Sequence, residues 1–253
     1  MSIQLRYYEN NWPFIEAVMD KFERLGILPH TLPNAIGMWP NEQECLVWTV
    51  SQCAPEKDWL EIGSFCGGSS VLLGLARQCM RAEGNVIAVD KAFNPMFDYN
   101  VGRSGVADQI VKVQCDSSKL LQHYNDLISF AFIDGFHSFK QVIHDFEAIN
   151  GIIDEGGVIA FHDVSPKMYT HDHYYLSELH NGVLHSWESL MSSTEEDFMI
   201  DQAIAYICIT YDYEIIDIPI RQNIKYFKET RLTEWVRGQT SPFNSFTAIR
   251  KKQ

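Results

Sequence analysis

Residues 58–70 have the sequence Asp-Trp-Leu-Glu-Ile-Gly-Ser-Phe-Cys-Gly-Gly-Ser-Ser (DWLEIGSFCGGSS), which combines three local patterns. Asp58–Ile62 is a short apolar run that predicts a β-strand. Gly63 and Gly67 follow it, and glycine allows a tight turn and a close approach of the backbone to a ligand. Ser69–Arg81 has the apolar spacing of a helix. A strand, a glycine-rich turn and a helix in this order indicate an α/β fold with a ligand site at the turn.

Outward from this unit, short apolar runs alternate with helical stretches. The further predicted strands are Asn85–Val89, Ile110–Gln114, Ile128–Ile133, Gly157–Phe161 and Tyr213–Ile220. The further predicted helices are Ser117–Asn125, Phe139–Ile149 and residues 174–192. Residues 201–210 are compatible with either state. Such alternation is typical of a doubly wound α/β fold, in which helices cover both faces of a parallel sheet.

Two helices are predicted ahead of the sheet, over residues 11–26 and from Asn41, the expected N-cap, to about Cys53. A stretch with three prolines separates them and predicts a loop. The chain is thereby divided into a helical N-terminal extension (1–54), a central domain (55–220) and a basic tail (221–253). The tail carries eight basic and two acidic residues, a net charge of +6.

The composition excludes several classes of protein. The chain has 253 residues, 46% of them hydrophobic, and a formal net charge of −13. The apolar content excludes a disordered chain, and the acidic balance argues against nucleic acid as a partner. Six cysteines without a CxxC pair are typical of reduced thiols in the cytoplasm, and no stretch approaches the roughly 18 apolar residues of a membrane helix. We expect a cytoplasmic protein without a signal peptide or a membrane partner.

Acidic side chains follow the ends of the predicted strands. They are Glu61, Asp90, Asp116, Asp134 and Asp163, the last of them preceded by His162. Ligands of parallel α/β sheets bind outside the carboxyl ends of the strands, so these residues are candidates for a site. Asp90 ends the second strand, where an acid can accept both ribose hydroxyls of an adenosine. Asp116 has the alternative role of a helix N-cap.

Asp134, His162 and Asp163 end neighbouring strands and are expected to converge. This mixture of oxygen and nitrogen donors suits a divalent metal, Mg²⁺ or Mn²⁺ if the ligands are mainly oxygen. Two carboxylates brought together repel each other unless a cation or a proton lies between them. His137 follows Asp134 by three residues, in IDGFHSF, and is within reach of the same site.

The glycine-rich turn departs from the dinucleotide pattern Gly-x-Gly-x-x-Gly, because Phe65 occupies the place of the second glycine. A bulky residue at that place blocks the close approach that a pyrophosphate requires. A nucleotide-dependent oxidoreductase therefore stays an alternative that Phe65 disfavours.

The run EIGSFCGGSS resembles the first motif of the class I S-adenosylmethionine-dependent methyltransferases. It is most similar to the metal-dependent O-methyltransferases, which include the catechol enzymes. IDGFHSF and GGVIAFHD resemble a bacterial subfamily that methylates sugars and natural products. The resemblance covers about residues 55–220. It implies a mostly parallel Rossmann-like sheet with an antiparallel last strand, S-adenosylmethionine as cofactor and a divalent metal, with Mg²⁺ favoured.

The resemblance also implies which residues bind the cofactor. Gly63 would approach its methionine part, and Glu61 would bind its amino group directly or through water. Asp90 would take the ribose hydroxyls, and Asp116 would lie near the adenine. The whole implied set is Glu61, Gly63, Ser69, Ser70, Asp90, Asp116 and Asp134, with either serine holding the cofactor's carboxylate.

For the metal, Asp134 matches the first aspartate ligand of the catechol enzymes. His162 falls on their second aspartate and Asp163 on their asparagine, so it stays open whether His162 ligates the metal. His137 falls where those enzymes place a lysine base and is the candidate catalytic base. The implied acceptor is a hydroxyl of a small polyhydroxylated molecule, a sugar or a natural product.

Two alternatives stay open within the resemblance. One is a metal-independent methyltransferase with His137 as base, and the other is a cofactor-binding protein without catalysis. The acidic body and the basic tail permit a homo-oligomer without requiring one.

Overall fold

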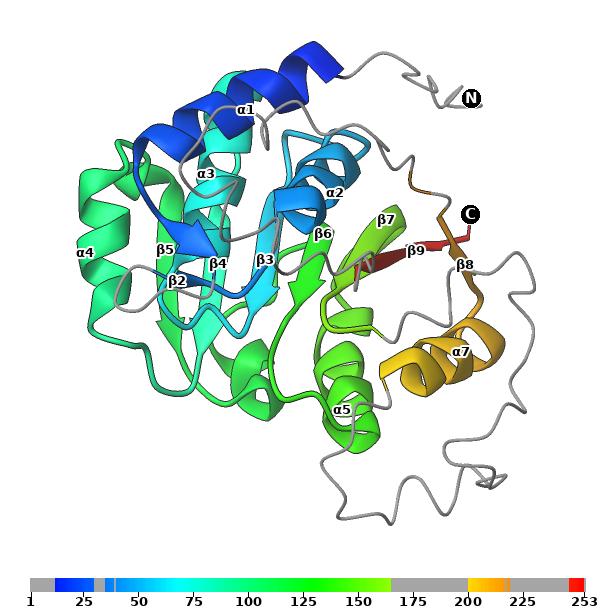
Figure 1. Ribbon diagram of the computed structural model, residues 1–253. Coiled ribbons are helices and arrows are strands. Elements are labelled where there is room, and N and C mark those ends of the chain that lie inside the picture. The colour runs from blue at the N-terminus through cyan, green and yellow to red at the C-terminus, as the bar shows by residue number, and fades with distance from the viewer. Residues whose placement is uncertain are drawn as a thin grey trace, which may run out of the picture.

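The computed structural model describes residues 12–29, 35–38, 40–164, 200–216, 218 and 246–252. Within these ranges the protein has a seven-stranded sheet with helices on both faces (Figure 1). Two further strands of two residues each, β1 (Leu28–Pro29) and β2 (Ala35–Ile36), pair with each other in the proline-rich stretch. No helix among the described residues is long and apolar enough to cross a membrane.

The large sheet has the strand order β5-β4-β3-β6-β7-β9-β8. Its strands are β3 (Asp58–Ile62), β4 (Val86–Asp90), β5 (Ile110–Gln114), β6 (Ile128–Ile133), β7 (Ile153–Phe161), β8 (Tyr213–Ile215) and β9 (Thr247–Lys251). The first five pair in parallel, and β9 is antiparallel to both β7 and β8. The strand order changes direction at β3, between β4 and β6, and such a switch point opens a crevice at the carboxyl ends of the strands.

Helices cover the two faces of this sheet separately (Figure 1). On one face lie α1 (Trp12–Arg24), α2 (Pro40–Val50), α3 (Gly68–Met80) and α4 (Met96–Arg103). On the other lie α5 (Phe139–Asn150), α7 (Ile200–Thr210) and the 3₁₀ helix η2 (Ser117–Gln122). A second 3₁₀ helix, η1 (Ala107–Gln109), precedes β5.

The buried strands supply both cores by alternation. Trp59 and Phe130 pack with the α1–α4 face, whereas their neighbours Leu60 and Ala131 pack with the α5–α7 face. Successive side chains of a strand point to opposite faces, so a strand covered on both sides is apolar throughout. This pattern explains why β6 is buried at all six positions.

The prediction of a doubly wound, mostly parallel sheet is confirmed, and β3, β5 and β6 have the predicted bounds. Residues 201–210, which fitted either state, belong to helix α7. Helix α2 begins at Pro40, so Asn41 is not its N-cap. Proline at the first helical position has no hydrogen-bonding N–H to lose. The predicted helix over 174–192 lies outside the described residues.

The sheet extends past the predicted boundary at residue 220, because β9 comes from the predicted basic tail. The antiparallel strand is β9, whereas β8 covers only Tyr213–Ile215 and runs in the same direction as β7. At the other end of the chain, α1 and α2 share one buried cluster with α3 and the sheet. Elements from all three predicted segments therefore belong to one packed unit.

Candidate active site

A cavity of about 690 Å³ opens at the carboxyl ends of the central strands. This volume lies in the range of small-molecule sites, roughly 300–1,000 Å³. The predicted site residues that line it are Gly63, Ser69, Asp90, Asp116, Asp134, His137, His162 and Asp163. Glu61 and Ser70 are not among the described residues that line it. The topology thus brings eight of the ten predicted site residues to one cavity.

At Gly63, the backbone that follows β3 packs closely against the backbone that follows β6. This residue has a φ of +94°, and a Cβ atom here would overlap the carbonyl oxygen of Asp134. Only glycine combines that backbone conformation with that proximity. The glycine is needed for strand packing as well as for the predicted approach of a ligand.

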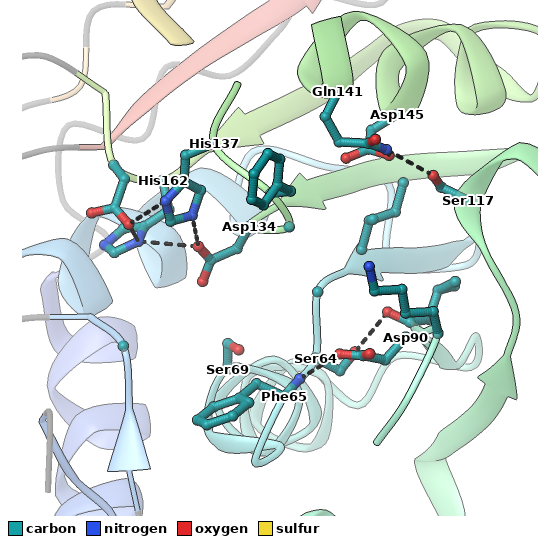
Figure 2. A pocket seen from close by; sticks show the side chains of 18 of the residues that line it. Ser64, Phe65, Ser69, Asp90, Ser117, Asp134, His137, Gln141, Asp145 and His162 are labelled. Atoms are coloured by element: carbon teal, nitrogen blue, oxygen red, sulfur yellow. Dashed lines mark hydrogen bonds and ion pairs between the residues drawn. The ribbon is translucent and has the colours of Figure 1, made fainter. Parts of the chain in front are cut away.

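Asp90 is oriented by two backbone groups at the mouth of β4 (Figure 2). Its Oδ2 accepts a hydrogen bond from the Phe65 N–H and its Oδ1 accepts one from the Ala92 N–H, each at 2.9 Å. Each carboxylate oxygen keeps a second lone pair for a ligand. Phe65 has a φ of +41°, and its side chain is 50% exposed beside the cavity. Asp90 is therefore preorganised to accept a pair of hydroxyls, the role that its sequence position predicts.

Glu61 and Ser70 form a buried pair next to the glycine-rich turn. Ser70 Oγ donates a hydrogen bond to Glu61 Oε2, and Glu61 Oε1 is buried without a hydrogen-bond partner among the described residues. Burial raises the pKa of the Glu61 carboxyl to about 7, against the opposing effect of nearby serine hydroxyls. Because Glu61 does not line the cavity, its predicted contact with the cofactor's amino group needs a bridging water.

Asp116 caps the helix that follows it. Its Oδ1 accepts hydrogen bonds from the Ser118 N–H at 3.0 Å and from Ser118 Oγ at 2.6 Å. These hydrogen bonds lower the pKa of the Asp116 carboxyl. The capping alternative is thus observed, while Asp116 also lines the cavity where the predicted adenine contact would lie.

A second polar group lines the same end of the cavity and was not predicted. Gln141 Nε2 donates to Asp145 Oδ1 at 2.8 Å and lies 3.4 Å from Ser117 Oγ (Figure 2). Asp145 is 1% exposed, and burial raises its pKa to about 6. The sequence holds a sign of this residue, since Asp145 lies on the apolar stripe of α5 beside Val142 and Phe146.

Asp145→Asn is expected to stabilise the protein at neutral pH. The folded pKa of about 6 lies above the ordinary 3.8, so the native state favours the protonated acid. The destabilising effect of the carboxylate is absent below about pH 4, grows as the pH rises toward 6 and is constant above it. Two pKa units correspond to about 3 kcal/mol at most.

Urea unfolding of wild type and Asp145→Asn between pH 4 and pH 8 measures this effect. The variant's advantage in the free energy of unfolding should be near zero at pH 4 and largest at pH 8. A variant that is less stable than wild type at pH 8 would contradict the assigned cause.

The ends of β6 and β7 carry a compact ionic cluster of Asp134, His162 and Asp163, together with Glu42 of α2. His162 Nδ1 lies 3.2 Å from Asp134 Oδ1 and 3.5 Å from Asp163 Oδ2. On its other side, His162 Nε2 lies 3.0 Å from Glu42 Oε2. The predicted convergence of Asp134, His162 and Asp163 is therefore observed, and Glu42 is a member that sequence reasoning missed.

His137 bridges the two aspartates from the side of the cavity. Its Nδ1 lies 3.3 Å from Asp163 Oδ2, and its Nε2 lies 3.7 Å from Asp134 Oδ1. Figure 2 shows that His137, His162 and Asp134 point toward one another. Asp90 lies on the opposite side of the cavity. Asp163 has a φ of +54°, a left-handed conformation that aspartate tolerates and that is frequent at functional sites.

The charges of this cluster shift its protonation equilibria. The nearby carboxylate of Asp134 raises the pKa of His137. Burial opposes a charge on His162, yet the carboxylate of Asp134 and the other acids raise its pKa well above the ordinary value. Burial likewise favours neutral Asp134, but the two histidines lower its pKa. The cluster therefore favours an ionised Asp134 beside positively charged imidazoles.

A comparison with known protein families finds a match in the central part of the chain. Residues 60–164 match a family described as a methyltransferase domain. This segment is similar to methyltransferase domains. The matched residues include every predicted cofactor and metal residue, whereas Glu42 lies outside them.

Solved methyltransferases have the same fold as this chain at low sequence identity. The methyltransferase PaMTH1 of Podospora anserina, bound to S-adenosylhomocysteine, is 14% identical with a TM-score of 0.57, over 94% of this chain and 88% of that one. The Bacillus cereus O-methyltransferase with the same ligand is 14% identical with a TM-score of 0.54, over 95% and 91%. TomG of Streptomyces achromogenes, an O-methyltransferase of tomaymycin synthesis bound to S-adenosylmethionine, is 11% identical with a TM-score of 0.54, over 95% and 90%.

The residues of the matched segment fit S-adenosylmethionine. Asp90 presents two oriented oxygens for a diol, and the unpartnered Oε1 of Glu61 is a buried acceptor beside the glycine-rich turn. A carboxylate oxygen without a partner is costly, so a cationic or water donor at this position would relieve that cost. The half-exposed Phe65 is compatible with this cofactor, which lacks a pyrophosphate.

The donor set also fits a divalent cation. Asp134, His162 and Asp163 each offer one ligand atom, and these atoms lie within 4.8 Å of one another. Two carboxylates and an imidazole suit several divalent metals. Protons on the two histidines can balance the same negative charge. The geometry is therefore compatible with a site that binds a metal and with a site that does not.

Proposed function

We propose that the protein transfers the methyl group of S-adenosylmethionine to a hydroxyl of a small polyhydroxylated molecule, a sugar or a natural product, with help from a divalent metal. One observation carries the proposal. The same cavity is lined by Asp90 and the glycine-rich turn on one side, and by His137 and the Asp134–His162–Asp163 cluster on the other. A cofactor held at the first side would expose its reactive end toward a cluster that can accept a proton and hold a cation.

The solved relatives support O-methylation as the reaction. The Bacillus cereus protein and TomG are both O-methyltransferases, and TomG takes part in the synthesis of a natural product. At 14% and 11% identity they do not identify the acceptor of this chain, so the polyhydroxylated acceptor rests on the motifs IDGFHSF and GGVIAFHD.

In the proposed complex the cofactor supplies an electrophilic methyl group on a positively charged sulfur. Asp90 accepts hydrogen bonds from the ribose hydroxyls, and Glu61 acts on the amino group through water. Ser69 lines the cavity and would contact the carboxylate of the cofactor. These residues fix the cofactor, so that alignment of oxygen, carbon and sulfur supplies much of the rate enhancement.

Asp134 and Asp163, with His162, would hold the metal, whose charge would favour the ionised form of a nearby hydroxyl. His137 accepts the hydroxyl proton, and its position between Asp134 and Asp163 orients the imidazole. The oxygen then forms a bond to the methyl carbon as the carbon–sulfur bond breaks. S-adenosylhomocysteine and the methylated acceptor are the products.

Methyl transfer from labelled S-adenosylmethionine to a panel of sugars, glycosides and catechols tests the proposal, in Mg²⁺ and in excess EDTA. Calorimetric titration of S-adenosylmethionine, with NAD as control, accompanies it. We expect binding of S-adenosylmethionine but not NAD, and transfer that needs the metal. Absence of S-adenosylmethionine binding would overturn the proposal.

The rival functions give different results in the same assay. Transfer that persists in EDTA and is lost in His137→Gln would indicate a metal-independent enzyme with His137 as base. Cofactor binding without transfer to any member of a broad panel would favour a non-catalytic protein.

A further inference from the structure

Glu42 is a fully buried carboxylate at the back of the ionic cluster. It lies near the start of α2 and is 0% exposed. Its Oε2 is 3.0 Å from His162 Nε2, across 120 residues of sequence. Glu42 is not among the residues that line the cavity, whereas His162 is. A side chain from outside the matched domain thus contacts a central member of the site from behind.

The two ring nitrogens of His162 face different surroundings. Nε2 lies 3.0 Å from Glu42 Oε2, and Nδ1 lies 3.2 Å from Asp134 Oδ1 and 3.5 Å from Asp163 Oδ2. The side chain is 3% exposed, so the ring has little freedom to exchange these positions. The imidazole edge that points to the candidate metal ligands is therefore set by the contact on the opposite edge.

Both ring nitrogens of His162 face carboxylates, so without a metal each can carry a hydrogen. A cation bound at Nδ1 would displace the hydrogen there, because a ligating nitrogen needs its lone pair. The remaining hydrogen then lies on Nε2, where the Glu42 carboxylate can accept it. Histidines that bind metals commonly donate their other N–H to a carboxylate, which orients the ring and makes it a stronger ligand.

We propose that Glu42 is a positioning residue that holds His162 as the Nε2–H tautomer, so that Nδ1 can serve as the nitrogen ligand of a divalent cation with Asp134 and Asp163. The inference rests on the metal role in the proposed function and extends it. It resolves the sequence ambiguity in favour of ligation by His162. It also makes the N-terminal helix α2 a part of the site, although no sequence motif around Glu42 indicates such a role.

Mn²⁺ titration of the full chain, followed by electron paramagnetic resonance, measures the cation affinity without turnover. Glu42→Leu is expected to weaken Mn²⁺ binding by roughly 10- to 100-fold, the usual effect of removing such a partner. Glu42→Gln is expected to stay within a few-fold of wild type, because its amide oxygen still accepts from Nε2–H. Asp58→Asn is the control, since Asp58 is another hydrogen-bonded carboxylate, at the opposite end of β3.

Nitrogen NMR of ¹⁵N-histidine-labelled wild type with saturating Mg²⁺ reports the tautomer directly. A protonated Nε2 and an unprotonated Nδ1 on His162 support the proposal. A protonated Nδ1 overturns it, even if Glu42→Leu fails to fold.

The outcomes separate this inference from the proposed function. If wild type and Glu42→Leu bind Mn²⁺ equally, the positioning role is wrong and the metal role stands. If Glu42→Gln is as weak as Glu42→Leu, charge rather than the tautomer is what matters and the proposal is overturned. If wild type binds no Mn²⁺, the metal role fails and this inference fails with it.

Discussion

Asp134→Asn is expected to lower kcat/KM for methyl transfer by at least about 100-fold, the range of a lost proton-transfer or metal-binding group. Asp134 Oδ1 lies 3.2 Å from His162 Nδ1 and 3.7 Å from His137 Nε2. The amide removes a negative charge that both imidazoles face and replaces a carboxylate ligand with a weaker one. Mn²⁺ affinity should fall together with kcat/KM.

Asp90→Asn is the matched comparison for this change. Asp90 lies in the same cavity but contacts the backbone at Phe65 and Ala92 instead of the histidines. We expect its substitution to weaken binding of S-adenosylhomocysteine and to leave Mn²⁺ affinity unchanged. Calorimetry on the two variants separates the roles. A loss of S-adenosylhomocysteine binding in Asp134→Asn would favour the predicted contact of Asp134 with the cofactor, and full activity would refute both roles.

Gly63→Ala is expected to destabilise the fold by about 3 kcal/mol or more. The added Cβ meets the carbonyl oxygen of Asp134 and the Cα of Gly135, which are backbone atoms that cannot rotate aside. A φ of +94° adds strain for a residue with a side chain. Overpacking typically costs 1–3 kcal/mol, and an unfavourable φ costs a similar amount, so the two effects together approach the stability of many domains.

Gly102→Ala is the control for this substitution. Gly102 lies within α4, and nothing comes within 4 Å of a Cβ built there. Alanine favours a helix over glycine by about 1 kcal/mol, so this variant should be slightly more stable than wild type. Urea unfolding of both variants gives the comparison. Wild-type stability in Gly63→Ala would show that β3 and β6 can separate without cost.

Much of the site could be predicted because parallel strands place their carboxyl ends at one edge. Asp134 and the His162-Asp163 pair directly follow apolar runs that become β6 and β7. Buried parallel strands are recognisable from short sequence windows, since their side chains are apolar on both faces. The convergence of these three residues therefore follows from the order of the strands.

The residues that sequence reasoning missed depend on distant contacts. Glu42 meets His162 across 120 residues, and no local spacing encodes that contact. Strand β9 carries Arg250 and Lys251, and its place in the sheet depends on pairing with β7 and β8. Helix α4 has only a short apolar face, with Phe97 and Val101 one turn apart, so its packing against α3 determines its state.

The position of β9 has a consequence for how the chain folds as it is synthesised. β9 lies between β7 and β8, yet it is the last of the described strands to leave the ribosome. Until residues 247–251 emerge, the edge of β7 has no partner and can pair with strands of other chains. β7 leads directly into the His162-Asp163 pair, so the strand that carries this part of the candidate site gains its second neighbour only with the final described segment. A nascent chain stalled before this point would hold the His162-Asp163 pair of the candidate active site beside an open, aggregation-prone edge.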